Sequence, residues 1–201
     1  MSRTAVRIFF NFRSPYCYLV SHQLFARLAA FDVDILWRSL SGWDGRSPPE
    51  RAKVKVPLTR QDVARWCRRM QVPFNPPPIS TDPTPAALVA FAAKDAGLLG
   101  RYVERVMWRE WAEGQDIGNT EVLEGVASDI GLPVVAVHAA LNDFRLLARL
   151  QENWQEAESL GVIGVPSFVV GDQIFWGNDR LDFLEEHLAE LGLKKLEPDR
   201  R

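Results

Sequence analysis

The sequence predicts an α/β fold in which an all-helical insertion separates the two halves of a small sheet. An apolar run at residues 5–12, a helical pattern and a β-branched run at residues 33–38 form a βαβ unit near the N-terminus. After a loop, helical periodicity dominates the chain from residue 59 to residue 160. From residue 160 the pattern returns to strand, tight turn, strand and helix.

The first unit is justified by its alternating signals. The strand at residues 5–12 is almost wholly apolar and is predicted to be buried. A helix follows it to about Phe31, and a second strand covers Val33 to Arg38. A crossover of this length between parallel strands is almost always right-handed.

The insertion is predicted to begin with a long loop, because residues 41–57 are rich in glycine, proline and charge. Thr59 is the predicted N-cap of the next helix, which ends near Gln71 and carries Val63 and Cys67 on its apolar face. Further helical patterns follow at residues 84–96, 98–113, 119–130, 133–141 and 143–160.

The closing part contains two short strands, at residues 166–170 and 173–176, with a tight turn between them. A last helix opens at residues 177–180. The order βαβ, helical block, ββα is that of a thioredoxin-like fold. We therefore expect a thioredoxin-like domain made of residues 1–40 and 160–201, and an inserted helical domain with its connecting loop at residues 41–159.

The composition argues against several classes of function. The 201 residues carry a formal net charge of −2, and 47% are hydrophobic, as in an ordinary soluble globular protein. Without a basic excess, neither nucleic acid nor an acidic membrane surface is an expected partner. No apolar run is long enough to span a bilayer, and the first residues lack the pattern of a secretory leader. With only two cysteines and no pattern of disulfide staples, we expect a cytoplasmic protein.

The turn Ser14-Pro15-Tyr16-Cys17, between the first strand and its helix, is the strongest candidate site. Backbone N–H groups at the start of a helix favour a negative charge such as a thiolate. Ser14 carries a hydroxyl, so the thiolate has to come from another molecule. Ser14 also suits an ordinary helix N-cap with Pro15 at the first helical position, and the two roles are compatible.

Other reactive side chains are predicted to be structural. Cys17 is expected to be a small buried apolar residue, because a dithiol cycle needs a second thiol close by and Ser14 provides none. The three histidines lie in unrelated segments without metal-ligand spacing, so no metal site is expected.

Two further segments have either a binding or a purely structural role. If the bond between Val165 and Pro166 is cis, the amide and carbonyl of Val165 point away from the sheet and can pair with an extended ligand; otherwise the segment is only a turn. Asn178 and Asp179, at the head of the last helix, either bind a ligand or merely cap that helix.

Four motifs, taken in order, resemble those of the 2-hydroxychromene-2-carboxylate isomerases, relatives of the kappa-class glutathione transferases with a DsbA-like thioredoxin fold. They are FRSPY at residues 12–16, QDVARW at 61–66, GVIGVPSF at 161–168 and FWGNDRL at 175–181. The resemblance covers nearly the whole chain. It implies a homodimer that binds glutathione and isomerises a small-molecule aromatic acid, an unsaturated keto or hemiketal acid such as 2-hydroxychromene-2-carboxylate.

The resemblance also assigns roles at the glutathione site. It implies that Ser14 is catalytic and hydrogen-bonds the glutathione sulfur. It implies that Val165, next to the cis-proline Pro166, pairs with the cysteinyl backbone. The γ-glutamyl end is expected at Asn178 and Asp179.

Substrate contacts are implied for Tyr16, Arg46 and Lys55, and Lys55 is also implied at the glycine carboxylate of glutathione. Arg46 departs from the resemblance, because many family members have an asparagine in a Gly-Asn-x-Pro-Pro loop where this chain has Gly-Arg-Ser-Pro-Pro. An arginine adds a charge and a longer reach, so it bears on the choice of substrate.

The expected mechanism is a transient addition. Ser14 and the helix amides favour the glutathione thiolate, which attacks an electrophilic carbon and is expelled after the adduct has rotated. A glutathione transferase that releases a stable conjugate would use the same residues. A non-catalytic thioredoxin-fold module that binds a peptide beside the cis-proline is a further alternative, whereas Ser14 argues against a thiol–disulfide oxidoreductase.

Overall fold

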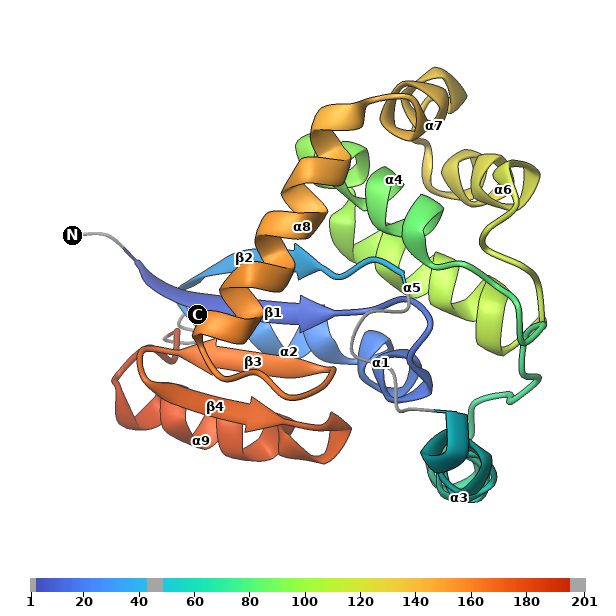
Figure 1. Cartoon of the computed structure of the whole chain (residues 1–201). Helices are drawn as coiled ribbons and strands as arrows, with labels where there is room; N and C mark the ends of the chain where they lie inside the picture. The colour runs from blue at the N-terminus through green and yellow to red at the C-terminus, as the bar shows by residue number, and fades with distance from the viewer. Residues whose placement is uncertain (1–2, 43–48, 196–201) are drawn as a thin grey trace, which may run out of the picture.

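The computed structural model describes residues 3–42 and 49–195, and within them a four-stranded mixed sheet forms the centre of the fold (Figure 1). The strands are β1 (Thr4–Phe10), β2 (Val33–Ser39), β3 (Ser167–Val170) and β4 (Gln173–Trp176), in the order β2-β1-β3-β4. β1 pairs with β2 in parallel and with β3 antiparallel, so the first and last parts of the chain meet in one sheet. The predicted thioredoxin-like order is confirmed.

The helices follow the predicted order along the chain. They are α1 (Pro15–Ser21), α2 (Leu24–Leu28), α3 (Pro49–Met70), α4 (Thr84–Asp95), α5 (Leu99–Trp111), α6 (Thr120–Ile130), α7 (Val134–Leu141), α8 (Phe144–Ser159), the 3₁₀ turn η1 (Asn178–Arg180) and α9 (Leu181–Glu190). The helix expected up to Phe31 is divided into α1 and α2, with a break at residues 22–23. The other predicted helices after α3 agree with the structure to within two residues.

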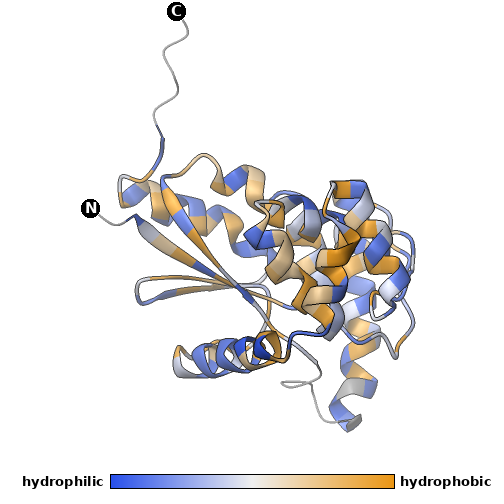
Figure 2. Ribbon diagram, turned by 90° about the horizontal axis from the view of Figure 1, so that it is seen from above, coloured by the Kyte–Doolittle hydropathy of each residue, from blue (hydrophilic) through white to orange (hydrophobic). Residues whose placement is uncertain are grey.

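The sheet has helices on both faces, as the view from above shows (Figure 2). Successive residues of a strand point to opposite faces. Val6 and Ile8 of β1 belong to the main core, on the face covered by α1, α2 and α9. Phe9 belongs to a smaller cluster with Ala157 of α8, on the other face. The alternation in β1 therefore places one helical layer on each side of the sheet.

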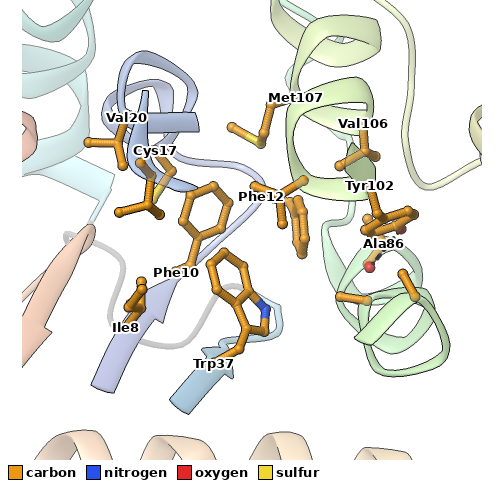
Figure 3. Close-up of a cluster of buried hydrophobic side chains, with 14 of the residues drawn as sticks. Ile8, Phe10, Phe12, Cys17, Val20, Trp37, Ala86, Tyr102, Val106 and Met107 are labelled. Carbon is orange, nitrogen blue, oxygen red and sulfur yellow. Dashed lines mark hydrogen bonds between the residues drawn. The ribbon is translucent and has the colours of Figure 1, made fainter. Parts of the chain in front are cut away.

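The inserted helices share a continuous core with the end of the sheet (Figure 3). The rings of Phe10 and Trp37 lie 4.8 Å apart, and Phe12 meets Tyr102 of α5 edge-on at 5.9 Å. The Tyr102 hydroxyl donates a 2.9 Å hydrogen bond to the Ala86 carbonyl of α4. Because the start of α1 rests on this core, the turn at Ser14 has a rigid support.

One predicted element is wrong. The long loop expected over residues 41–57 gives way to helix at Pro49, so Thr59 lies inside α3 and is not an N-cap. Pro57 lies within this helix, where it removes one backbone donor and leaves the carbonyl of residue 53 without its usual partner. The surrounding turns are exposed, so water can hydrate that carbonyl. Arg46 lies outside the described residues.

The second half of α3 agrees with the prediction. Val63 and Cys67 are buried, and Arg65, Arg68 and Arg69 form its exposed face. Among the described residues, no helix is long and apolar enough to cross a membrane.

Candidate functional site

Ser14 caps α1 as the sequence predicts. Its backbone is extended, Pro15 is the first helical residue, and the Cys17 N–H donates to Ser14 Oγ at 3.4 Å. The Ser14 hydroxyl in turn donates to the Val165 carbonyl at 3.4 Å. Both hydrogen bonds are long, so the hydroxyl is held weakly and can turn towards a ligand. α1 has only seven residues, so we assign a bound anion to the Ser14 hydroxyl, with the N–H groups of the first turn beside it.

The bond between Val165 and Pro166 is cis, and it lies directly opposite Ser14. The Pro166 carbonyl accepts a 3.0 Å hydrogen bond from the Gly177 N–H, which links this segment to the start of η1. No backbone carbonyl in residues 3–42 and 49–195 accepts from the Val165 amide. The Val165 N–H is therefore available to an extended ligand.

Asn178 and Asp179 lie in η1, which packs against α1. The N-cap of α9 is Arg180, without a side-chain capping bond, so the purely capping role considered for Asn178 and Asp179 is wrong. The Asp179 carboxylate pairs with the Arg180 guanidinium at 2.9 Å and remains partly exposed. It also lies close enough to Tyr16 to raise the pKa of that phenol slightly.

An open groove of about 430 Å³ runs between the start of α1 and the exposed half of α3. Its lining residues come from one face of α3 and from Tyr16, and they are Tyr16, Arg51, Val54, Lys55, Leu58, Thr59 and Asp62. Positions 51, 55, 58 and 62 recur at helical spacing, so a single face of α3 forms one wall. The groove brings together Tyr16 and Lys55, the two described residues that were expected to contact the substrate.

Tyr16 joins the two walls of this groove. Its hydroxyl donates a 3.0 Å hydrogen bond to Asp62 Oδ2. Burial, together with this hydrogen bond and the charge of Asp62, raises the pKa of Tyr16 to about 12. Tyr16 therefore stays a neutral phenol, able to donate a hydrogen bond, across the physiological pH range.

Neither cysteine can supply a thiolate at neutral pH. Cys17 is fully buried, among Phe10, Val20 and Met107 (Figure 3), and burial raises the pKa of its thiol to about 12. Burial also raises the pKa of Cys67, on α3, to about 11. Both are free thiols, and the predicted apolar role of Cys17 is confirmed.

Arg51 and Asp62 were missed as site residues. Arg51 fell in the wrongly predicted loop, although its spacing of four from Lys55 would have placed it beside that lysine on a helix. Asp62 stood in a recognised motif without a role. No group of three or more His, Cys, Asp or Glu in the described part of the chain is placed to hold a metal ion.

Comparison with known proteins agrees with this geometry. The model of the DSBA-like thioredoxin domain matches residues 5–189. The chain belongs to this family. A family relative from Sphingobium xenophagum, 2-hydroxychromene-2-carboxylate isomerase, is 31% identical over 201 residues, covering 94% of this chain and 100% of the relative.

Two solved structures have the same fold. A 2-hydroxychromene-2-carboxylate isomerase (HCCA isomerase) superposes with a TM-score of 0.77 at 24% identity, over 94% of this chain and 96% of that one. The cytosolic disulfide reductase DsbM from Pseudomonas aeruginosa, in a structure with GSH, has a TM-score of 0.70 at 19% identity, over 92% and 99% of the two chains. At these identities the likeness establishes the fold alone.

Proposed function

We propose that this family member is a glutathione-dependent isomerase of an unsaturated aromatic keto or hemiketal acid such as 2-hydroxychromene-2-carboxylate. One observation carries the proposal. The Ser14 hydroxyl and the Val165 backbone meet beside an open groove, while both thiols of the chain are buried and protonated. The name of the Sphingobium relative supports this reaction, and the DsbM structure with GSH supports an external thiol.

The described residues fit glutathione. Ser14 Oγ, held only by two 3.4 Å hydrogen bonds, can turn to donate to the sulfur. The Val165 amide can donate to the cysteinyl carbonyl, since no backbone acceptor in the described ranges uses it. The partly exposed carboxylate of Asp179, together with Asn178, suits the ammonium of the γ-glutamyl group. When bound, glutathione supplies the nucleophilic thiolate.

The groove suits the substrate. Val54 and Leu58 are 66% and 58% exposed and offer an apolar wall for an aromatic ring. Arg51 and Lys55, one helical turn apart, can hold a carboxylate between them. Tyr16 donates its only proton to Asp62, so its oxygen can accept a hydrogen bond from a substrate hydroxyl while its ring lines the groove. An acid with an apolar ring is therefore the substrate class that these walls favour.

The deciding experiment combines calorimetry with product analysis. We expect saturable binding of glutathione, and isomerisation of 2-hydroxychromene-2-carboxylate that needs glutathione but leaves its concentration unchanged. Consumption of glutathione would instead indicate a transferase that releases a conjugate. Absence of saturable binding would contradict the proposal and favour a module that binds a peptide beside Pro166.

The proposal extends to the setting of the enzyme. We propose a cytoplasmic location, because the two buried free thiols suit a reducing compartment. We propose a homodimer, as the resemblance implies, and light scattering at working concentration tests this assembly.

A further inference from the structure

Directly before Ser14, the Arg13 side chain turns into the protein and meets Glu110 of α5. The side chains of Arg13 and Glu110 are 16% and 0% exposed, and Arg13 Nη1 lies 3.8 Å from Glu110 Oε1. The guanidinium lies over the Trp111 ring, 5.3 Å from its centre, and Nη2 donates to the Pro78 carbonyl at 3.1 Å. Arg13 is thus fixed by packing and by one backbone acceptor, while its charge faces Glu110.

The hydrogen-bonding capacity of Glu110 is unfilled. Both of its carboxylate oxygens are buried and have no hydrogen-bond partner among the described residues. Arg13 Nε and Thr81 Oγ1 are buried and unpartnered in the same way. A fully buried carboxylate anion normally needs hydrogen bonds as well as a counter-charge, and an ion pair at 3.8 Å does not provide them. The geometry therefore disfavours the ionised form of Glu110.

The charged and titratable groups around Glu110 agree with this conclusion. Burial raises the pKa of Glu110 well above its usual range, Asp116 adds to the rise, and Arg13 opposes it only in part. The Trp111 indole also lies close enough to lower the pKa of Glu110. Its N–H, however, donates to the Phe12 carbonyl at 3.5 Å and not to the Glu110 carboxylate.

Two other groups belong to this environment. Cys17 of α1 is close enough to Glu110 that ionisation of this acid raises the pKa of the Cys17 thiol further. Arg60 of α3 is close enough to repel Arg13, and Asp116 is close enough to attract it, although less strongly than Glu110. Since the Cys17 N–H binds Ser14 Oγ, the first turn of α1 lies within the electrostatic reach of position 110.

We propose that Glu110 is a positioning residue that holds a proton at neutral pH, so that Arg13, next to Ser14 in the chain, keeps a positive charge that Glu110 does not neutralise and that favours an anion at the Ser14 hydroxyl. The identity of that anion, a glutathione sulfur, rests on the proposed function. The charge arrangement of Arg13 and Glu110 does not depend on that function, so an experiment can contradict either one without the other.

A reporter thiol tests the charge without glutathione. In the variant Ser14→Cys, the pKa of the new thiol is measured from thiolate absorbance against pH, with the single variant as reference. Adding Arg13→Met is expected to raise this pKa by about one unit, which is roughly tenfold less thiolate below the pKa. Adding Glu110→Gln is expected to leave it unchanged near pH 7, because glutamine has the shape and the neutrality of the protonated acid.

Two controls separate charge from structure. Arg13→Lys keeps the positive charge and is expected to restore most of the low pKa. Arg101→Met removes the same charge from an exposed position on α5 and is expected to leave the pKa unchanged. If Arg13→Met does not fold, as judged by circular dichroism, the Arg13→Lys and Glu110→Gln measurements still decide.

Two results would overturn the proposal, and a third would overturn only the proposed function. A fall in the reporter pKa on Glu110→Gln would mean that Glu110 is ionised and neutralises Arg13, which overturns the proposal. An unchanged pKa in folded Arg13→Met would also overturn it, because the arginine charge would not reach position 14. If the wild type does not bind glutathione but the Ser14→Cys variants show the expected pKa shifts, the proposed function is overturned and this inference is supported.

Discussion

Replacing Ser14 with alanine removes the one hydroxyl that the site offers to a bound sulfur. A hydrogen bond to a charged group contributes about 1.5–3 kcal/mol, and each pKa unit corresponds to about 1.4 kcal/mol, so the loss raises the pKa of the bound thiol by roughly one to two units. A thiol near its free pKa of about 8.5 is only a few per cent thiolate at pH 7. We therefore expect Ser14→Ala to lower turnover at pH 7 about tenfold or more, and the deficit to shrink as the pH rises above 8.5.

The structural cost of this change is small. The capping bond from the Cys17 N–H is 3.4 Å long, so its loss is expected to lower the free energy of unfolding by only about 0.5–1 kcal/mol. Glutathione binding should be mostly retained, because Val165 and Asp179 are untouched. The conservative variant Ser14→Thr keeps a hydroxyl and serves as the matched control.

The assay measures the isomerisation rate against pH for the wild type, Ser14→Ala and Ser14→Thr, with glutathione affinity determined by calorimetry. Full turnover of Ser14→Ala at pH 7 would refute the role of the hydroxyl. An equal deficit at every pH would also contradict the argument, because a defect in forming the thiolate must disappear once the free thiol ionises.

Three other substitutions test separate parts of the structure. Tyr16→Phe removes the 3.0 Å hydrogen bond to Asp62 and should lower the free energy of unfolding by about 1 kcal/mol in urea titrations. Since the pKa of Tyr16 is about 12, the substitution should not change the shape of the pH–rate profile below about pH 10. Lys55→Met should raise the KM of the acid substrate about tenfold with kcat nearly unchanged, and a loss confined to kcat would contradict a binding role. Burial raises the pKa of Glu156, but its two arginine partners, on β1 and β2, lower the pKa by more. Glu156 therefore stabilises the fold fully at pH values above the ordinary glutamate pKa of 4.5, and this stabilisation is lost as the pH falls below the lowered pKa. Glu156→Gln should therefore destabilise the protein at pH 7 and much less at pH 3, whereas an equal effect in denaturant titrations at both values would contradict this assignment.

Three segments of the site could be predicted from the sequence because each has a local cause. Ser14 followed by Pro15 is a helix start wherever a strand precedes it. Val165-Pro166 comes directly before a strand, and Gly177, with a φ of 122°, marks the turn into η1. Short-range chemistry fixes the backbone at all three points. The pairing of β1 with β3 then brings the three segments together.

The wall formed by α3 could not be predicted in the same way. Proline in the interior of a helix costs about 3 kcal/mol, so Pro57 correctly argues against helix in isolation. The helix nevertheless continues through it, because its second half is anchored in the core by Val63 and Cys67. The exposed first half extends from that anchor. Arg51 became a site residue only through this tertiary effect.

Glu110 shows a different limit, one that the sequence pattern itself could have overcome. The buried positions of α5 are Tyr102, Val103, Val106, Met107, Glu110 and Trp111, a regular apolar stripe in which one member is an acid. A charge on the buried stripe of a helix requires a partner or a proton. Periodicity could therefore have singled out this position, whereas its partner Arg13 became visible only when α5 and the turn before α1 were seen in contact. Such a pair spans almost 100 residues of sequence, and its two members lie on segments that local rules describe separately. The electrostatics behind Ser14 therefore depend on how the helical insertion packs against the sheet domain, and a substitution of Arg13 is expected to alter the sulfur chemistry although Arg13 touches no ligand.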